Sequence, residues 1–315
     1  MSIIREQLPY TLDEFDAENL GQRYKGKVRE NFHLDNEIIM VTTDRVSAFD
    51  HVLGTIPFKG QILTEIANFW FEKTKHNAPN HIISLPDPQV LLAKKAETLP
   101  VEVIVRGYIT GSLWREYEQG INGQYGFMLP EGLKKDQLFD EPILTPSTKA
   151  QYGLHDEPIA RKDIVNKIVK ESVYAKAEEY AIQLFAAGQE WAAKQGLILV
   201  DTKYEFGMVD DELIVIDEIH TPDSSRYWIA SEYEDHFNKG ENQKMLDKEN
   251  IRQWLIDRGF SGEGTPPPLT DEIRVILAER YIELYNQLTG KEFNPVVGDV
   301  KTRIETNLIK AGIYA

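Results

Sequence analysis

Two apolar stretches separated by a short acidic turn place the strongest constraint on the fold of this chain. Residues 196–207 read GLILVDTKYEFG, and residues 212–220 read ELIVIDEIH. Apolar runs of this length with a turn between them predict two antiparallel strands joined as a hairpin. Along the first strand Asp201, Lys203 and Glu205 are two residues apart, so these three charged side chains are expected on one face of the sheet.

A turn centred on Asp211 would place Glu205 directly opposite Asp217. Opposed residues have Cβ atoms about 4.5–5.5 Å apart, and two carboxylates at that separation repel each other. A divalent cation relieves this repulsion, and Mg²⁺ takes one or two protein carboxylates together with water and nucleotide phosphates. The alternative is a solvated sheet face whose charges align by chance, and a register shift of one residue would separate the pair.

Two arginines accompany the predicted strands. Arg226 follows the hairpin in HTPDSSRYW, and its guanidinium can bind a phosphate or a carboxylate. Arg106 lies within the apolar stretch VEVIVRGYITGSLW, where an unpaired charge would be costly. Gly111 and Ser112 then begin a helix whose free N–H groups and dipole favour an anion. A purely structural role, on the surface or beside a buried carboxylate, is an equal alternative for both arginines.

A glycine between basic residues, in Tyr24-Lys25-Gly26-Lys27-Val28-Arg29, interrupts strand-like sequence near the N-terminus. The segment does not match the P-loop, which requires GxxxxGK[ST] before a helix. One interpretation is a hairpin turn lying over nucleotide phosphates, like the glycine-rich flap of protein kinases. A Gly-Lys pair is common, however, and recurs at residues 290–291, so the pair alone does not decide.

The remaining pattern predicts an α+β protein with antiparallel sheets. The first hundred residues are mainly strand-like with one helix over residues 60–76, and Pro100 marks a break that we take as the boundary between two lobes. Residues 122–158 predict a long loop, residues 161–196 predict helices, and Thr270 is a candidate N-cap of a helix in the tail. The predicted division is residues 1–100, an N-terminal nucleotide-binding lobe, and residues 101–315, a catalytic lobe with a helical tail.

The charge balance and the missing cysteines exclude several classes of protein. The chain has 35 Lys and Arg against 51 Asp and Glu, a formal net charge of −16, which argues against broad binding to nucleic acids or anionic membranes. The absence of cysteine excludes thiol catalysis, disulfides and cysteine-ligated metals. No apolar run approaches the ~18 residues of a membrane span. We therefore expect a cytoplasmic globular protein.

Taken together, the motifs closely resemble those of the phosphoribosylaminoimidazole-succinocarboxamide synthase (SAICAR synthetase) family of purine biosynthesis. The stretches that carry the resemblance are YKGKVRE, TTDRVSAFDH, VEVIVRGYITGSLW, TPSTKA with HDE, LILVDTKYEFG and IDEIHTPDSSRYW. They follow the order of the family from Tyr24 to Trp228, and the later DKENIRQWL is similar to a segment of its longer members. The resemblance implies a two-lobed fold with antiparallel sheets and an ATP site between the lobes.

The resemblance implies an ATP-dependent ligase that joins the carboxylate of a phosphoribosyl carboxyaminoimidazole (CAIR) to the amine of L-aspartate. Because a carboxylate resists attack by an amine, the γ-phosphoryl group of ATP is transferred to it first, and the amine then displaces phosphate from the acyl phosphate. Such a protein mainly positions reactants and neutralises charge. ATP and Mg²⁺ are the expected cofactors, CAIR and L-aspartate are the expected small-molecule partners, and the oligomeric state is left open.

The resemblance also implies roles for individual residues. The nucleotide flap comprises Gly26, Lys27, Val28 and Arg29, and the adenine side comprises Lys94, Thr98 and Leu99. The magnesium ligands are Glu205 and Asp217. By the same resemblance, the residues that contact the imidazole nucleotide, directly or through metal, are Asp50, Arg106, Ser112 and Arg226. Lys149 and Lys203 stabilise the transferring phosphoryl group, and Asp201 orients Lys203.

Two other classes of function share parts of the pattern. A small-molecule kinase would have the flap and the paired carboxylates but would phosphorylate a hydroxyl group. A non-catalytic nucleotide-binding module would have no need of the full set of acids, lysines and arginines. The compounds required for ADP release distinguish the three hypotheses.

Overall fold

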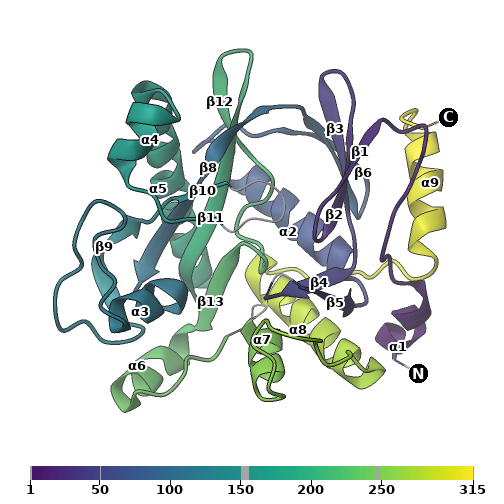
Figure 1. The fold of residues 1–315 in the computed structure, drawn as a ribbon. Coiled ribbons are helices and arrows are strands. Elements are labelled where there is room, and N and C mark those ends of the chain that lie inside the picture. Colours follow the sequence, from purple (N-terminus) through teal and green to yellow (C-terminus); the bar gives the residue numbers. More distant parts are fainter. Residues whose placement is uncertain (1, 50, 150–155, 246–248, 315) are drawn as a thin grey trace. The chain divides into compact units, whose positions relative to one another are not determined.

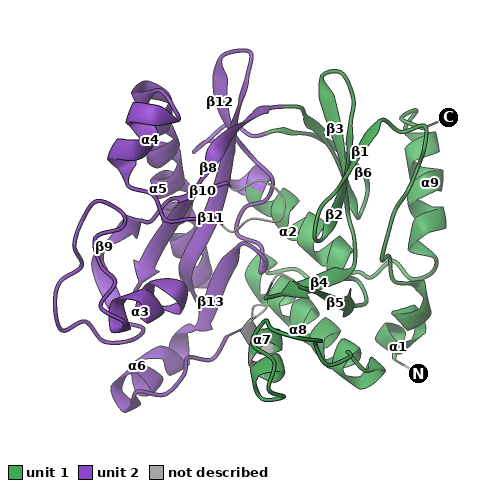
Figure 2. Ribbon diagram, in the orientation of Figure 1, with its two compact units in different colours: residues 1–70, 81–95, 246–315 green, residues 71–80, 96–245 purple. Residues whose placement is uncertain are grey.

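The computed structural model describes residues 2–49, 51–149, 156–245 and 249–314 (Figure 1). The chain divides into two compact units (Figure 2). Unit 1 comprises Met1–Trp70, His81–Lys95 and Leu246–Ala315, and unit 2 comprises Phe71–Asn80 and Ala96–Met245. This division differs from the predicted one, because the helical tail belongs to the unit of the N-terminal strands.

Unit 1 is built on an antiparallel sheet with the strand order β1-β2-β3-β7-β6 and on a separate pair, β4-β5. The strands are β1 (Gln22–Lys25), β2 (Arg29–His33), β3 (Glu37–Thr42), β4 (Arg45–Ala48), β5 (His51–Thr55), β6 (Ile82–Asp87) and β7 (Val90–Lys94). The helices are α1 (Ile3–Gln7), the short 3₁₀ helix η1 (Leu8–Tyr10), α7 (Glu249–Ile256), α8 (Asp271–Thr289) and α9 (Val300–Lys310), while the division between the units falls within α2 (Lys59–Thr74).

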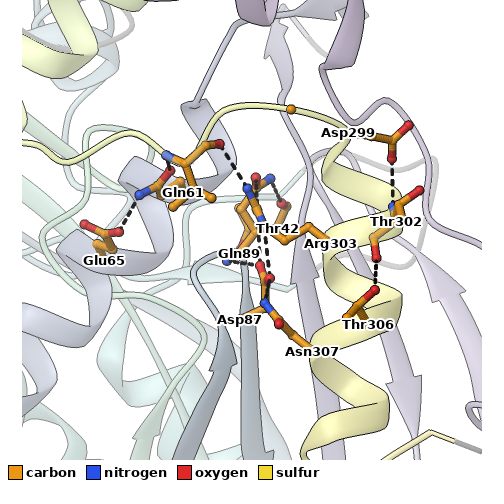
Figure 3. A network of polar contacts seen from close by, with 12 residues as sticks. Thr42, Gln61, Glu65, Asp87, Gln89, Asp299, Thr302, Arg303, Thr306 and Asn307 are labelled. Atoms are coloured by element: carbon orange, nitrogen blue, oxygen red, sulfur yellow. Dashed lines mark hydrogen bonds and ion pairs between the residues drawn. The ribbon is translucent and has the colours of Figure 1, made fainter.

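Helix α9 packs against the sheet of unit 1 through apolar and polar contacts. Ile304 and Leu308 belong to the same buried cluster as Phe32 and Ile39 of the sheet. Figure 3 shows the polar part, in which side chains of α9 reach the turn between β6 and β7. Arg303 Nε donates to Asp87 Oδ2 at 3.0 Å, Arg303 Nη2 to Gln89 Oε1 at 2.8 Å, and Asn307 Nδ2 to Asp87 Oδ2 at 2.7 Å. The buried carboxylate of Asp87 therefore has its charge compensated by α9.

Unit 2 is built on an antiparallel sheet with the order β10-β8-β11-β12, in which β13 also pairs with β11 and β9 with β8. The strands are β8 (Glu97–Tyr108), β9 (Leu138–Leu144), β10 (Ser147–Thr148), β11 (Leu197–Val209), β12 (Glu212–Ile216) and β13 (Ser225–Ile229). The helices are α3 (Gly111–Glu118), α4 (Arg161–Lys167), α5 (Glu171–Lys194) and α6 (Ala230–Lys239), and α5 packs against β8 and β11 (Figure 1). The predicted α+β class with antiparallel sheets is confirmed.

Two local predictions are wrong. Pro100 does not break the chain into separate strands, because β8 continues through it. The register between β8 and β11 is irregular there, between the pairs Glu205–Glu102 and Gly207–Thr98, and such irregular stretches tolerate a proline that cannot donate to the ladder. Residues 122–158 are not a continuous loop, since they contain β9 and β10, which both pair with β8 along the edge that faces away from β11.

The helix predictions are confirmed. The helix expected over residues 60–76 is α2, and residues 161–196 form α4 and α5. Thr270 caps α8, its Oγ1 accepting from the N–H of Ile273 at 3.5 Å. Across the ranges that the structure describes, no helix combines the length and apolar character needed to cross a membrane.

Candidate active site

The pairing of β8 with β11 brings acids and bases from two sequence motifs onto one sheet face. Arg106 pairs with Asp201, and Glu102 pairs with Glu205, with regular pairing between them. Because side chains alternate along a strand, Lys203 lies on the same face as its neighbours two residues away. The sheet face predicted to carry the charged side chains of β11 therefore also carries Glu102 and Arg106 of β8.

Lys203 bridges two carboxylates on this face. Its Nζ donates to Glu102 Oε1 at 2.8 Å and forms an ion pair with Glu205. The other carboxylate oxygen of Glu205 forms an ion pair with Lys149, which directly follows β10. Ser147 of β10 pairs with Glu102 in the register and approaches its carboxylate at 3.5 Å. The two lysines therefore compensate the negative charges that the register places opposite each other.

The charged forms of these groups depend on one another. Burial would raise the pKa of Glu205, but the charges of Lys203 and Lys149 hold that pKa below the ordinary value. Burial likewise opposes the charged form of Lys203, yet the surrounding carboxylates, Glu205 foremost, raise its pKa well above the ordinary value. Burial raises the pKa of Glu102. At neutral pH the cluster thus holds the Glu205 carboxylate, which can bind a cation, beside the Lys203 ammonium, which can bind an anion.

The register of the hairpin corrects the predicted position of Asp217. The turn consists of Asp210 and Asp211, so Glu205 pairs with Ile216 rather than with Asp217. Asp217 follows β12 directly and has a φ of 65°, so the alternation of the strand no longer fixes the direction of its side chain. Its negative charge nevertheless contributes to the raised pKa of Lys203. Asp217 therefore lies near the charged cluster without being the cross-strand partner of Glu205.

Glu102 is the member of the cluster that sequence reasoning missed. It is buried and lies opposite Glu205 on the β8 side of β11, whereas Ile216 holds the position on the β12 side that the prediction gave to Asp217. The sequence carries a signal for it, because Glu102 and Arg106 are four residues apart in an otherwise apolar strand and must share a face. Two buried charges on one strand face indicate a polar site more strongly than Arg106 alone.

A second cluster, two residues away along β11, joins both predicted arginines through Asp201. Asp201 Oδ2 accepts from Arg226 Nη1 at 2.9 Å and from Arg106 Nη1 at 3.3 Å. Arg106 also donates from Nε to Thr145 Oγ1 at 2.7 Å and from Nη2 to Ser112 Oγ at 3.3 Å. The hydrogen bonds that the structure gives Asp201 thus orient two guanidinium groups, whereas Lys203, the residue it was expected to orient, bonds to glutamates.

Arg226 lies against the N-terminus of α3. Gly111, the first residue of this helix, has a φ of 59°, and a Cβ atom there would lie 2.6 Å from Nη2 of Arg226. Only glycine combines this backbone conformation with room for the guanidinium. A helix N-terminus beside Arg106 and Arg226 offers N–H donors and positive charge to one anionic group.

The predicted flap is the turn of the β1–β2 hairpin in unit 1. Gly26 N–H donates to the carbonyl of Arg29 at 2.8 Å, which closes the turn around Lys27 and Val28. The side chain of Lys27 is exposed. The flap therefore presents a basic side chain at the tip of a hydrogen-bonded hairpin.

The other predicted nucleotide and substrate residues are divided between the units. Lys94 ends β7 of unit 1 and is exposed, whereas Thr98 and Leu99 lie in β8 of unit 2. The predicted substrate residue Asp50 lies outside the described residues.

Comparisons with known proteins give one consistent result. A model of the SAICAR synthetase family matches residues 22–267. The phosphoribosylaminoimidazole-succinocarboxamide synthase of Cytophaga hutchinsonii is 49% identical over 293 residues, covering 91% of this chain and 94% of that protein. The protein of the same name from Bacteroides fragilis is 46% identical over 305 residues, covering 95% of this chain and 97% of that protein.

Solved structures agree with the sequence relatives. The SAICAR synthase from Saccharomyces cerevisiae complexed with SAICAR has a TM-score of 0.80 at 33% identity, covering 90% of this chain and 100% of that chain. A SAICAR synthetase in complex with ADP has a TM-score of 0.66 at 26% identity, covering 87% of this chain and 100% of that chain. The similarity therefore extends over both units.

Proposed function

Since this chain belongs to the SAICAR synthetase family, its activity is the joining of CAIR and L-aspartate to give SAICAR in purine biosynthesis, and we propose how its residues perform that reaction. The observation that carries the proposal is the shared face of β8 and β11, where Lys203 lies between two carboxylates and Asp201 holds two arginines. Cytoplasmic location remains a prediction.

ATP is the expected phosphoryl donor, which is supported by the ADP complex of a structural relative. The residues present fit a magnesium ion with two protein ligands, because Glu205 is an ionised, buried carboxylate and Asp217 adds its charge nearby. Within the described part of the chain, no group of three or more acidic or histidine side chains could hold a metal. Mg²⁺ usually takes one or two protein carboxylates, and here it would complete its shell with water and phosphate oxygens and neutralise their charge.

Phosphoryl transfer to the CAIR carboxylate gives an acyl phosphate and ADP. In this step the Lys203 and Lys149 ammonium groups stabilise negative charge on the transferring phosphoryl group, and the high pKa of Lys203 keeps its proton in place. The amine of L-aspartate then attacks the acyl carbon, the C–O bond to phosphate breaks, and the amine loses a proton. The protein lowers both barriers by holding the reacting groups in place.

The cluster around Asp201 fits the anionic part of CAIR. Arg106 and Arg226 are both fixed by one carboxylate beside the N-terminus of α3, and guanidinium groups in such a place suit a phosphate group. Among Arg106, Arg226 and Asp201 themselves, two guanidinium groups carry more positive charge than one carboxylate compensates. The acidic protein thus has a local site that attracts an anionic substrate.

The omission of single components tests this assignment. ADP release is measured with ATP, MgCl₂, CAIR and L-aspartate, and then with each component left out in turn. We expect SAICAR to form only with the complete set. Full production of a stable phosphorylated compound without L-aspartate would identify a kinase instead, and binding of ATP without turnover in the complete mixture would identify a binding module.

Glu102→Gln is expected to lower kcat by roughly 10–100-fold. The substitution removes one of the two carboxylates that hold Lys203, and hydrogen bonds to charged groups contribute about 1.5–3 kcal/mol. Steady-state ADP release at saturating substrate concentrations measures the effect. Ser147→Ala is the control, because it removes only the weak 3.5 Å contact to the same carboxylate. Equal kcat values in the two variants would show that Glu102 does not contribute to catalysis through Lys203.

Gly111→Ala is expected to raise the KM for CAIR by about tenfold while leaving the KM for ATP unchanged. The added methyl group would displace the Arg226 guanidinium, at a cost on the order of 1–3 kcal/mol including backbone strain. Gly120→Ala is a matched control, since Gly120 also has a positive φ, of 76°, but nothing lies within 4 Å of an added Cβ. If both variants change the KM for CAIR equally, backbone strain alone explains the effect.

A further inference from the structure

A buried arginine and a neighbouring threonine hold the flap by its carbonyl groups. Arg45, at the start of β4, donates from Nη2 to the carbonyl of Gly26 and from Nε to the carbonyl of Lys27, both at 2.9 Å. The carbonyl of Val28 accepts from both the N–H and the Oγ1 of Thr43, at 2.9 and 2.8 Å. Three consecutive carbonyl groups therefore point towards Arg45 and Thr43.

This arrangement fixes the direction of the N–H groups of the same peptides. No cis peptide bond occurs in the described residues, and in a trans peptide the N–H points away from the C=O of the same plane. The N–H groups of residues 27, 28 and 29 belong to the three peptides whose carbonyls face Arg45 and Thr43, so they point to the opposite side. Successive N–H groups on one side of a turn are the arrangement that binds phosphate oxygens.

The charge of Arg45 is compensated at the turn itself. Arg45 Nη1 forms an ion pair with Glu30 Oε1 at 2.6 Å, and both side chains are buried. Arg23 Nη2 contacts the other oxygen of Glu30 at 3.2 Å from a more exposed position. A buried ion pair is weak evidence for stability, because desolvation offsets much of the attraction. The fork of a guanidinium, however, can donate to a carboxylate and to several carbonyls at once, which the single ammonium of lysine cannot reproduce.

We propose that Arg45 is a positioning residue for nucleotide binding, which sets the peptide orientation of the Gly26–Arg29 turn so that its N–H groups face the phosphates of ATP. This inference rests on the proposed assignment of that turn as the nucleotide flap. Arg45 acts through the turn, and Thr43 supports the same orientation at Val28.

Arg45→Lys tests the proposal. The variant keeps a positive charge beside Glu30 but loses the fork, so we expect about a tenfold rise in both the KM for ATP and the Kd for ADP, with the KM values for CAIR and L-aspartate unchanged. Arg23→Lys is the matched control: it alters the other arginine partner of Glu30 without touching the turn carbonyls, and it should leave ADP affinity unchanged. Thr43→Val should also weaken ADP binding, by a smaller factor than Arg45→Lys does. If Arg45→Lys fails to fold, Thr43→Val still tests whether the contacts to the turn carbonyls support ADP binding.

Lys27→Ala separates the inference from the flap assignment. If Lys27→Ala weakens ADP binding while Arg45→Lys and Thr43→Val do not, the flap stands and the role of Arg45 is refuted. If none of these variants changes ADP affinity, the flap assignment fails and the inference fails with it. A loss of affinity in Arg45→Lys that is equal for ADP and CAIR would show a general structural role and would also overturn the proposal.

Discussion

Replacing Lys203 with methionine is expected to lower kcat by on the order of 10²–10³-fold, the size of effect seen when a group that stabilises developing charge is removed. Lys203 is the cation between Glu102 and Glu205, and its pKa well above the ordinary value keeps it charged at neutral pH. Methionine preserves the length of the side chain but removes the charge. Single-turnover measurement of ADP formation with saturating ATP and CAIR isolates the phosphoryl-transfer step from product release.

The same variant has a second expected result, in its pH dependence. In the native protein Lys203 is the foremost charge that lowers the pKa of Glu205, so its removal raises that pKa. The Glu205 carboxylate then takes up a proton at a higher pH, and the acid limb of the pH–rate profile moves to higher pH. Lys176→Met, at a partly exposed lysine paired with Glu179, is the control for loss of one positive charge. A Lys203→Met protein with native kcat would remove this lysine from the mechanism.

Asp217→Asn is expected to lower kcat by on the order of 100-fold and to raise the MgCl₂ concentration for half-maximal activity at least about tenfold. Asparagine keeps the shape of aspartate and accepts the positive φ of this position, so the backbone after β12 is retained. What is lost is a negative charge near Lys203 and, if Asp217 holds magnesium as proposed, the anionic character of that ligand. Titration of activity with MgCl₂ at fixed ATP measures both effects.

Asp211→Asn provides a matched control for that experiment. Asp211 lies on the same hairpin with a nearly identical φ of 63°, but it is exposed at the turn. We expect native kinetics and native magnesium dependence from it. If Asp217→Asn also keeps the native magnesium dependence, Asp217 is not a metal ligand and the metal must be held by other groups.

The sequence predicted the class of fold and most elements, because their signals are local. The alternation of Asp201, Lys203 and Glu205 within an apolar run is sufficient to predict a strand with one charged face. The register of that strand depends on which residues form the turn, and one residue decides which side chain lies opposite Glu205. The predicted partner, Asp217, was therefore wrong as a cross-strand neighbour, although its charge does act at the cluster.

Contacts between residues far apart in the sequence could not be predicted. That Glu102 faces Glu205 follows from the pairing of β8 with β11, about a hundred residues apart in the chain, which no local pattern specifies. The same holds for Arg45: it lies within the motif TTDRVSAFDH, but the motif does not reveal its contacts to the carbonyls of a turn about 20 residues earlier.

The attachment of α9 to the sheet of unit 1 has a consequence for the order of folding during synthesis. Unit 2 is formed by residues 71–80 and 96–245, all of which leave the ribosome before α9 is made. The core of unit 1 needs Val300, Ile304 and Leu308, and the buried Asp87 needs Arg303. Domains fold as units as the chain emerges, so unit 2 can complete its core first. Unit 1, which carries the flap between β1 and β2, can complete its core only after α9 has been synthesised.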